Sequence, residues 1–220
     1  MTQQLIGADI EDAIWVRVSV PMASFGIPFA REFIESYPFP TPATVYGMML
    51  SYIGEVDRTV YAGSRLAIVV TQLGDPNILL RKIRRVKTKD LNDGKNSKPE
   101  FQTVLTGLEF LVGVGPQDSS LASRLKQGFA HPGGTSRFGG LSCGESHNLV
   151  DEFSLMSHCD ATTYLDRQDV FYLQPDESGE WAVPVWVDHV GSRHTVWERA
   201  SFRPFDGPTQ LKMFEIRRPS

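Results

Sequence analysis

The chain has 220 residues, of which 41% are hydrophobic, and a net charge of −4, which suits one domain with a packed core. Its two cysteines exclude a disulfide framework and favour a reducing compartment, and no run of about 18 apolar residues offers a membrane span. The first twelve residues carry acids and no apolar run, unlike a signal peptide. We therefore expect a cytoplasmic protein without a membrane partner.

The first part of the chain shows strand and helix signals. Residues 13–20 alternate apolar and polar side chains, which predicts a strand, and Pro21 is expected to end it. Thr41-Pro42 is a typical helix start, a hydroxyl followed by proline at the first helical position, and Gly54 is a typical stop. A second strand is expected at Leu66–Val70.

The middle of the chain predicts a two-stranded ribbon. Residues 78–86 are apolar at first and then basic, as in a strand that leaves the core, and Asn92-Asp93-Gly94 is a turn signal. Alternatively, residues 91–97 form a disordered loop. A long strand is expected at Leu105–Val114, followed by a helix at Ser119–Phe129.

The last third predicts further strands, at Val183–Val190 and Lys212–Ile216. Three tryptophans, Trp181, Trp186 and Trp197, are expected to give this part a core of its own. The whole pattern favours an α+β fold, with an antiparallel sheet and helices on one side of it.

The charged residues are unevenly distributed. Eight of the 22 Lys and Arg residues fall within residues 81–98, where two aspartates oppose them, so this segment carries +6 and the rest of the chain −10. We call this segment the basic arm, and its cations are Arg81, Lys82, Arg84, Arg85, Lys87, Lys89, Lys95 and Lys98. They would lie on both sides of a ribbon with almost no apolar cover, which favours a grip on a phosphate backbone. The alternative is an ordinary solvated face.

A glycine-rich segment at residues 136–146 is a second candidate site. Its glycines let the backbone approach a ligand closely, while Arg137 adds a cation and Phe138 a surface for base stacking. A tight turn between core strands is the alternative. Residues 140–144 read G-x-S-x-G, but no helix signal follows them, so a hydrolase is disfavoured. The spacing of the cysteines and histidines does not match a zinc site, and we expect no metal and no cofactor.

Several short blocks, in chain order, carry a family resemblance. They are Val18–Phe25, Tyr37–Ser51, Gly54-Glu55, Leu80–Lys82, Arg137–Ser142, Gly144–Ser146 and Leu149–Asp151. Together they resemble the amino-terminal signature of the fifth Cas protein family, in particular the DevS branch of type I CRISPR systems. The region after residue 151 matches only loosely.

The resemblance implies a ferredoxin-like, RRM-related domain of the RAMP type at residues 1–155. A β-hairpin thumb would be inserted at about 81–103, and a β-rich extension would follow at residues 156–220. The implied function is a non-catalytic subunit of a Cascade complex that anchors the 5′ handle of the CRISPR RNA (crRNA). Such a subunit contacts the large and backbone subunits and meets target DNA only through the complex, in defence or in RNA-guided transposition.

The resemblance also implies where RNA binds. Positions after the first strand would lie near the handle, and the amino end of the first helix would bind phosphate. The basic arm would grip the junction of handle and spacer, and the glycine-rich segment would add a further contact. The expected RNA-binding residues are Ser24, Phe25, Thr41, Thr44, Tyr46, Arg81, Lys82, Arg84, Arg85, Lys87, Lys89, Arg137, Phe138, Gly139, Gly140 and Ser142.

Two other functions are open alternatives. One branch of the family cleaves precursor RNA with a tyrosine beside a lysine and a histidine. Tyr46 with His131 or His147 as general base would make a metal-independent endoribonuclease, but the chain has no adjacent Lys-His pair, so we expect binding without catalysis. The other alternative is a structural connector whose arm meets an acidic partner protein.

Overall fold

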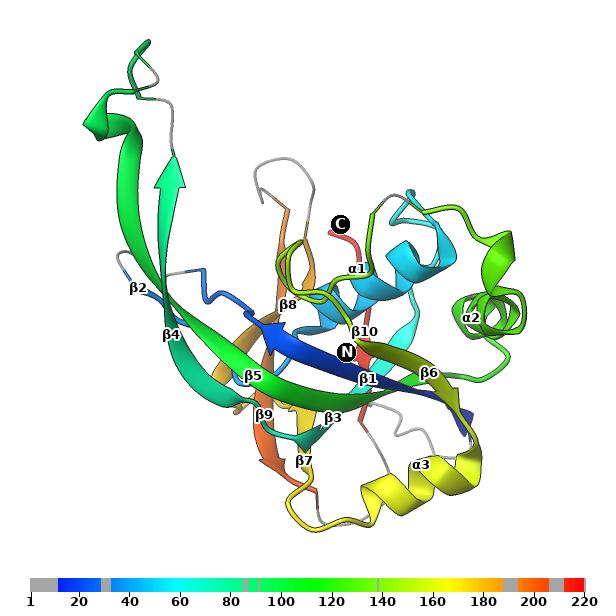
Figure 1. Ribbon diagram of the computed structural model, residues 1–220. Coiled ribbons are helices and arrows are strands. Elements are labelled where there is room, and N and C mark those ends of the chain that lie inside the picture. The colour runs from blue at the N-terminus through cyan, green and yellow to red at the C-terminus, as the bar shows by residue number, and fades with distance from the viewer. Residues whose placement is uncertain are drawn as a thin grey trace.

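The computed structural model describes residues 12–28, 33–84, 87–90, 92–137, 139–187, 194–205 and 212–219, with only the backbone for Arg84. Two predicted RNA-binding residues, Arg85 and Phe138, lie outside the described residues. Within them, a ten-stranded sheet in the order β6-β1-β5-β3-β7-β9-β8 is the scaffold (Figure 1), with β10 beside β3, and β2 and β4 beside β5. The strands are β1 (Ile14–Ala23), β2 (Phe33–Ile34), β3 (Arg65–Gln72), β4 (Asp75–Arg84), β5 (Ser97–Gly115), β6 (Glu152–Met156), β7 (Phe171–Pro175), β8 (Trp181–Trp186), β9 (Val196–Pro204) and β10 (Phe214–Glu215).

The first strand is longer than its sequence predicts. Its alternate residues Val16, Val18 and Val20 are fully buried, which confirms the predicted apolar face. However, β1 continues through Pro21 to Ala23, so the expectation that Pro21 ends it is wrong. β6 pairs with β1 only from Trp15 to Ser19, so Pro21 lies where β1 has a neighbour on one side. Such an edge position tolerates a residue without an N–H group.

Two helices, α1 (Pro42–Ile53) and α2 (Ser120–Ala130), lie close to their predicted positions. Thr41 precedes α1, and Gly54 ends it in the left-handed region at φ 72°. Ser119 caps α2, because its hydroxyl accepts a hydrogen bond from the backbone N–H of Ala122. Both helices pack on the sheet face that carries the valines of β1, and together they enclose the main core.

A third helix, α3 (His158–Leu165), covers the opposite face of the sheet (Figure 1). Its Ala161 and Leu165 pack with Trp15 of β1, Val69 of β3 and Leu111 of β5 in a second, smaller core. The expectation of helices on one side only is therefore wrong. With only two buried residues in eight, α3 has too weak an apolar stripe to be read from its sequence.

The last four strands extend the same sheet, because β7 pairs with β3 in antiparallel register. The ring of Trp181 lies 5.8 Å from that of Tyr37 and 5.4 Å from that of Phe39, and Trp186 lies 6.3 Å from Tyr46. These tryptophans therefore join the main core, and the expectation of a separate one is wrong. The third, Trp197, is 40% exposed. The domain boundary at residue 155 stays a prediction.

β4 and the first half of β5 form a long antiparallel hairpin, which Figure 1 shows projecting from the body. The pairing runs from Asp75 opposite Thr106 to Arg84 opposite Ser97. Near the tip, the buried side chain of Asn96 accepts hydrogen bonds from the backbone N–H groups of Lys87 at 2.6 Å and Thr88 at 2.9 Å. No helix in the described part of the chain is long and apolar enough to cross a membrane.

Candidate nucleic-acid interface

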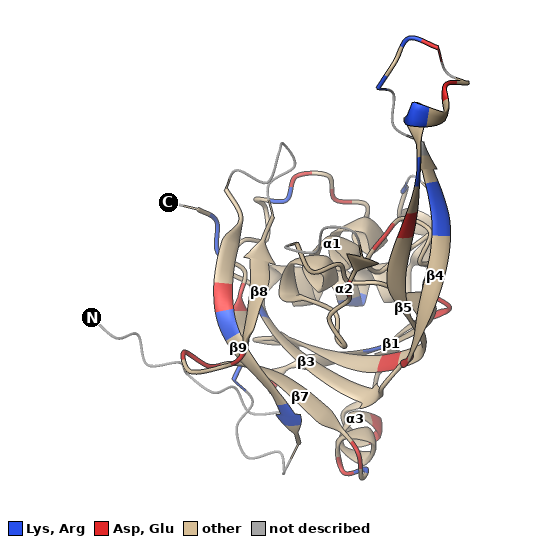
Figure 2. Ribbon diagram, turned by 90° about the vertical axis from the view of Figure 1, so that its left-hand side faces the viewer, with Lys and Arg blue, Asp and Glu red and all other residues tan. Residues whose placement is uncertain are grey.

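Exposed lysines mark the outer half of the β4–β5 hairpin. All the lysines of the basic arm are exposed, namely Lys82, Lys87, Lys89, Lys95 and Lys98. Figure 2 shows basic residues along β4 and around the tip. In the described residues 77–84 and 97–104, the single carboxylate is Glu100, which is 4% exposed, whereas Asp75 at the start of β4 and Asp90 near the tip are exposed. The stem of the hairpin therefore presents positive charge to solvent, as phosphate binding requires.

Arg81 differs from these lysines because it already has anionic partners. Its Nη1 lies 2.7 Å from Oε2 of Glu145, and its Nη2 lies 3.4 Å from Oε2 of Glu100. The hydrogen bond to Glu145 raises the pKa of Arg81 further above its ordinary value. The predicted phosphate grip at Arg81 is thus occupied by carboxylates, and the side chain instead ties the hairpin to the loop after Gly144.

Glu145 is a central residue that the sequence analysis did not single out. Its Oε1 accepts a hydrogen bond of 2.5 Å from Nε2 of Gln102, and its backbone N–H donates to Oδ1 of Asn148. Burial acts to raise the pKa of Glu145, but the hydrogen bonds from Arg81 and Gln102 outweigh it, and the pKa is lowered. The only sequence signal was its place in the Gly144–Ser146 block.

Ser24 and Phe25 lie inside this network. The hydroxyl of Ser24, which is 1% exposed, donates to the carbonyl of Thr103 and accepts from Nε2 of Gln102. Phe25 is 3% exposed, and a Cβ atom at Gly144 would lie 3.4 Å from its ring and 2.6 Å from the carbonyl of Ser24. Only glycine fits at residue 144. The Ser24 hydroxyl is engaged with Thr103 and Gln102 at the base of the hairpin, and its RNA contact stays a prediction.

A pocket of about 330 Å³ lies at the amino end of α1, and we call it the α1 pocket. Thr41 and Thr44 line it together with Phe25, Gly144 and Glu145. The two threonine hydroxyls lie 3.0 Å apart and share a hydrogen bond, and Thr41 makes no side-chain cap to the helix backbone. The helix dipole makes this end favourable for a negative group. The structure thus brings three of the predicted blocks together, from β1, α1 and the glycine-rich segment.

Tyr46 lies beneath this surface. It is 1% exposed, its hydroxyl donates to the carbonyl of Arg58 at 2.6 Å, and burial raises its pKa to about 12. A phenol in this position can neither reach an RNA strand nor exchange a proton readily near neutral pH. The observed position of Tyr46 therefore disfavours both its predicted RNA contact and the endoribonuclease alternative.

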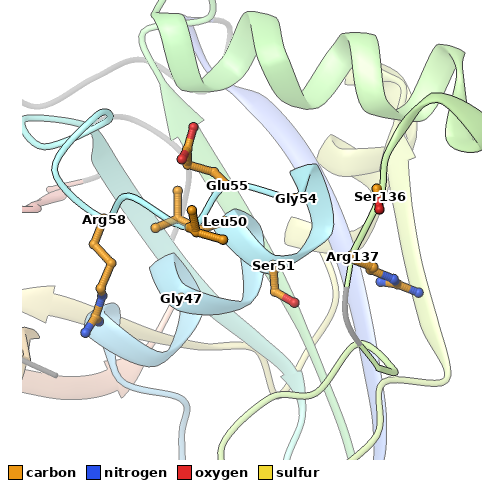
Figure 3. A pocket seen from close by; sticks show the side chains of 9 residues that line it. Gly47, Leu50, Ser51, Gly54, Glu55, Arg58, Ser136 and Arg137 are labelled. Atoms are coloured by element: carbon orange, nitrogen blue, oxygen red, sulfur yellow. The ribbon is translucent and has the colours of Figure 1, made fainter.

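Arg137 lies in a different place, beside a pocket of about 510 Å³ on the exposed side of α1, which we call the Arg137 pocket. Figure 3 shows Arg58 and Arg137 at opposite ends of it, with Ser51 between them. Arg58 is engaged, because it donates to the carbonyl of Val187 and lies 5.6 Å from the ring centre of Trp186. Arg137 is exposed and is the more available cation.

The rest of the glycine-rich segment folds as a small turn. Ser142 bridges to Leu149, and the carbonyl of Leu141 accepts a hydrogen bond from the N–H of Val150. Gly139 and Gly140 are exposed, and neither they nor Ser142 line the two pockets described above. The segment lies between the short helix η3 (Pro132–Gly134) and β6, so it is a turn but not one between two core strands, and its RNA contact stays a prediction.

The thiols lie apart from both pockets. Burial raises the pKa of Cys143 to about 12, so its thiol is poorly reactive, whereas Cys159 is exposed on α3. Among the described residues, no group of three or more His, Cys, Asp or Glu side chains could hold a metal ion.

Known proteins have similar sequences and similar folds. A family model described as CRISPR-associated protein (Cas_Cas5) matches residues 13–114. CRISPR-associated protein Cas5 from Myxococcus xanthus (strain DK1622) is 31% identical over 196 residues, which cover 84% of this chain and 87% of that protein. A chain of a solved CRISPR RNA-guided surveillance complex aligns with a TM-score of 0.64 at 14% identity, over 91% of this chain and 95% of its own. A crystal structure of a Cas protein gives 0.54 at 16% identity, over 88% and 94%.

The mixed fold with its large antiparallel sheet is thus one found among CRISPR-associated proteins, and its likeness extends over nearly the whole chain. The family follows from the sequence match to the Myxococcus xanthus protein, which exceeds 30% identity over most of both chains. The chain belongs to the Cas5 family of CRISPR-associated proteins, and the predicted family resemblance is confirmed.

Proposed function

We propose that this chain is a non-catalytic subunit that anchors the 5′ handle of a crRNA in a type I CRISPR Cascade complex. The observation that carries the proposal is the projecting hairpin, which exposes lysines on its stem and tip and keeps Glu100 turned inward. Exposed cations on a projecting ribbon suit a phosphate backbone that runs past the body of the protein. The likeness of the fold to a chain of a solved CRISPR RNA-guided surveillance complex supports a place in such a complex.

The hairpin corresponds, in this proposal, to the thumb of a ferredoxin-like, RRM-related core. The elements β1, α1, β3, β5, α2 and β6 follow one another in the βαββαβ order of that fold. Their strands lie side by side as β6-β1-β5-β3, and all these neighbours are antiparallel. The insertion between β3 and β5 then contains β4 and the basic arm.

The proposed RNA contacts lie at three places on the protein. The exposed lysines of the hairpin neutralise phosphates, the α1 pocket receives a negative group at Thr41 and Thr44, and Arg137 contributes a cation on the other side of α1. Arg81 supports the hairpin rather than the RNA. The large and backbone subunits are the protein partners, target DNA is met through the assembled complex, and the setting is cytoplasmic defence or RNA-guided transposition.

Neutralising the hairpin tests the proposal. The triple variant K82Q, K87Q and K89Q should weaken binding of fluorescently labelled handle RNA and flatten the dependence of log affinity on log salt by about 2, since each lost phosphate contact removes about 0.7. The matched control is K126Q, K212Q and R218Q, which changes net charge equally at exposed positions off the hairpin. Equal affinity and slope in both triple variants would show that the basic arm is only a solvated face.

A further inference from the structure

The two faces of the hairpin stem differ in chemistry. On the face that turns toward the body, Arg81, Glu100 and Gln102 take part in the network around Glu145. The opposite face carries large apolar side chains, contrary to the expectation that the ribbon has almost no apolar cover. On it, Ile78 is 69% exposed, Leu80 59% and Phe101 48%. We call this apolar face the outer face.

The apolar side chains of the outer face are aligned across three strands. Leu80 of β4 lies directly opposite Phe101 of β5, and Phe33 of β2 lies opposite Phe101 on its other side. Residues paired in this way point to the same side of a sheet. Phe33 is 36% exposed. Because neighbouring strands lie about 4.8 Å apart, the row is about 10 Å wide.

A cation borders the row. Lys82 follows Leu80 on the same face, two residues further along β4, and lies opposite Pro99. The nearest described carboxylate of the stem, Glu100, points to the other face and is 4% exposed. A large exposed apolar patch on a protein surface usually marks a binding site. Two phenyl rings, aliphatic neighbours and an exposed cation are the combination that holds unpaired bases and their phosphates.

We propose that the outer face is a stacking platform for one or two unpaired bases of the bound RNA. Phe101 and Phe33 offer their rings to the bases, Leu80 packs against a base edge or ribose, and Lys82 neutralises the adjoining phosphate. The platform selects unpaired over paired nucleotides and reads no particular base, since every base has a π face. This inference rests on the proposed RNA binding, and it adds a contact that depends on bases rather than on charge.

The experiment removes the ring and the base separately. Full-length wild type, F101L and F101Y are titrated with a labelled single-stranded handle RNA and with the same RNA carrying abasic sites. Leucine keeps the apolar bulk but loses the π face, whereas tyrosine retains it. We expect F101L to lose about tenfold in affinity for intact RNA with its salt slope unchanged, F101Y to bind like wild type, and the loss in F101L to vanish on abasic RNA.

A second measurement uses the wild-type protein alone. RNA substituted with 5-iodouridine should crosslink, on irradiation, to the peptide that contains Phe101 or to the one that contains Phe33. If wild type binds RNA in a salt-dependent way, but F101L binds equally well and neither peptide crosslinks, the platform is refuted and the row serves a protein contact, while the proposed function stands. If wild type binds no RNA at all, both proposals fail.

Discussion

The long strand β5 runs through two very different environments. From Glu109 to Val114 it lies between β1 and β3, and Phe110 and Leu111 are fully buried on opposite faces. From Ser97 to Thr103 it lies in the hairpin, where Phe101 is half exposed and Gln102 is buried against Glu145. One strand thus packs its apolar side chains into the core in one half and exposes them to solvent in the other.

The largest expected effect is on the free energy of unfolding, which substitutions in the two halves of β5 should change to very different extents. F110A removes a fully buried ring from the main core and should lower the free energy of unfolding by about 3–5 kcal/mol. F101A removes a half-exposed ring and should change the free energy by about 0.5 kcal/mol or less. Urea unfolding followed by circular dichroism gives both values. Similar losses in the two variants would mean that the outer face is part of the core.

An intermediate loss of stability is expected when Glu145, which holds the hairpin half of β5 through Gln102, is replaced. E145A removes the charged acceptor of Arg81 and Gln102, which keep Glu100 and Ser24 as their remaining partners, and the lost hydrogen bonds should cost about 1–3 kcal/mol. Amide hydrogen exchange should quicken in β4 and in residues 97–104 more than in residues 108–114. The control E177Q changes an exposed carboxylate elsewhere. Uniform exchange in E145A would show that Glu145 does not anchor the hairpin.

The smallest expected effect is a loss of stability at low pH. The folded-state pKa of Glu145 lies below its ordinary value of 4.5, so its stabilising contribution is present above pH 4.5 and is lost as the pH falls through the lowered value. Wild type should therefore lose more stability than E145Q between about pH 4.5 and pH 3 in urea titrations. E177Q should follow wild type. A wild-type curve parallel to that of E145Q would contradict the assigned role of the carboxylate.

Local signals made part of the fold predictable. Thr41-Pro42 and Gly54 bounded α1 in the sequence, and the alternation in residues 14–20 gave the buried face of β1. These features depend on neighbours within one helix turn or one strand. Pairings between distant segments could not be predicted, and Trp181 packing on Tyr37 is an example.

The position of the candidate site could be predicted from the sequence, but the roles of its individual residues could not. The segment rich in lysine and arginine did become the exposed hairpin, but charge alone could not tell Arg81 from Lys82. What distinguishes them is Glu145, 64 residues further along the chain, which meets only one face of β4. The apolar run 78–80 indicated a strand leaving the core, and its exposure follows from β4 lying beyond the body, which no local pattern encodes.

The continuity of β5 has a mechanical consequence. β5 runs as one strand from the main core into the hairpin, with Gly107 in the left-handed region at φ 74° between the two parts, so the twist of the body sheet and this residue together set the direction in which the hairpin points. The ion pair of Arg81 and Glu145 ties the outer part of the stem to the loop after Gly144. The orientation of the lysines near the tip therefore depends on packing in the body of the protein, and substitutions in the body should change it.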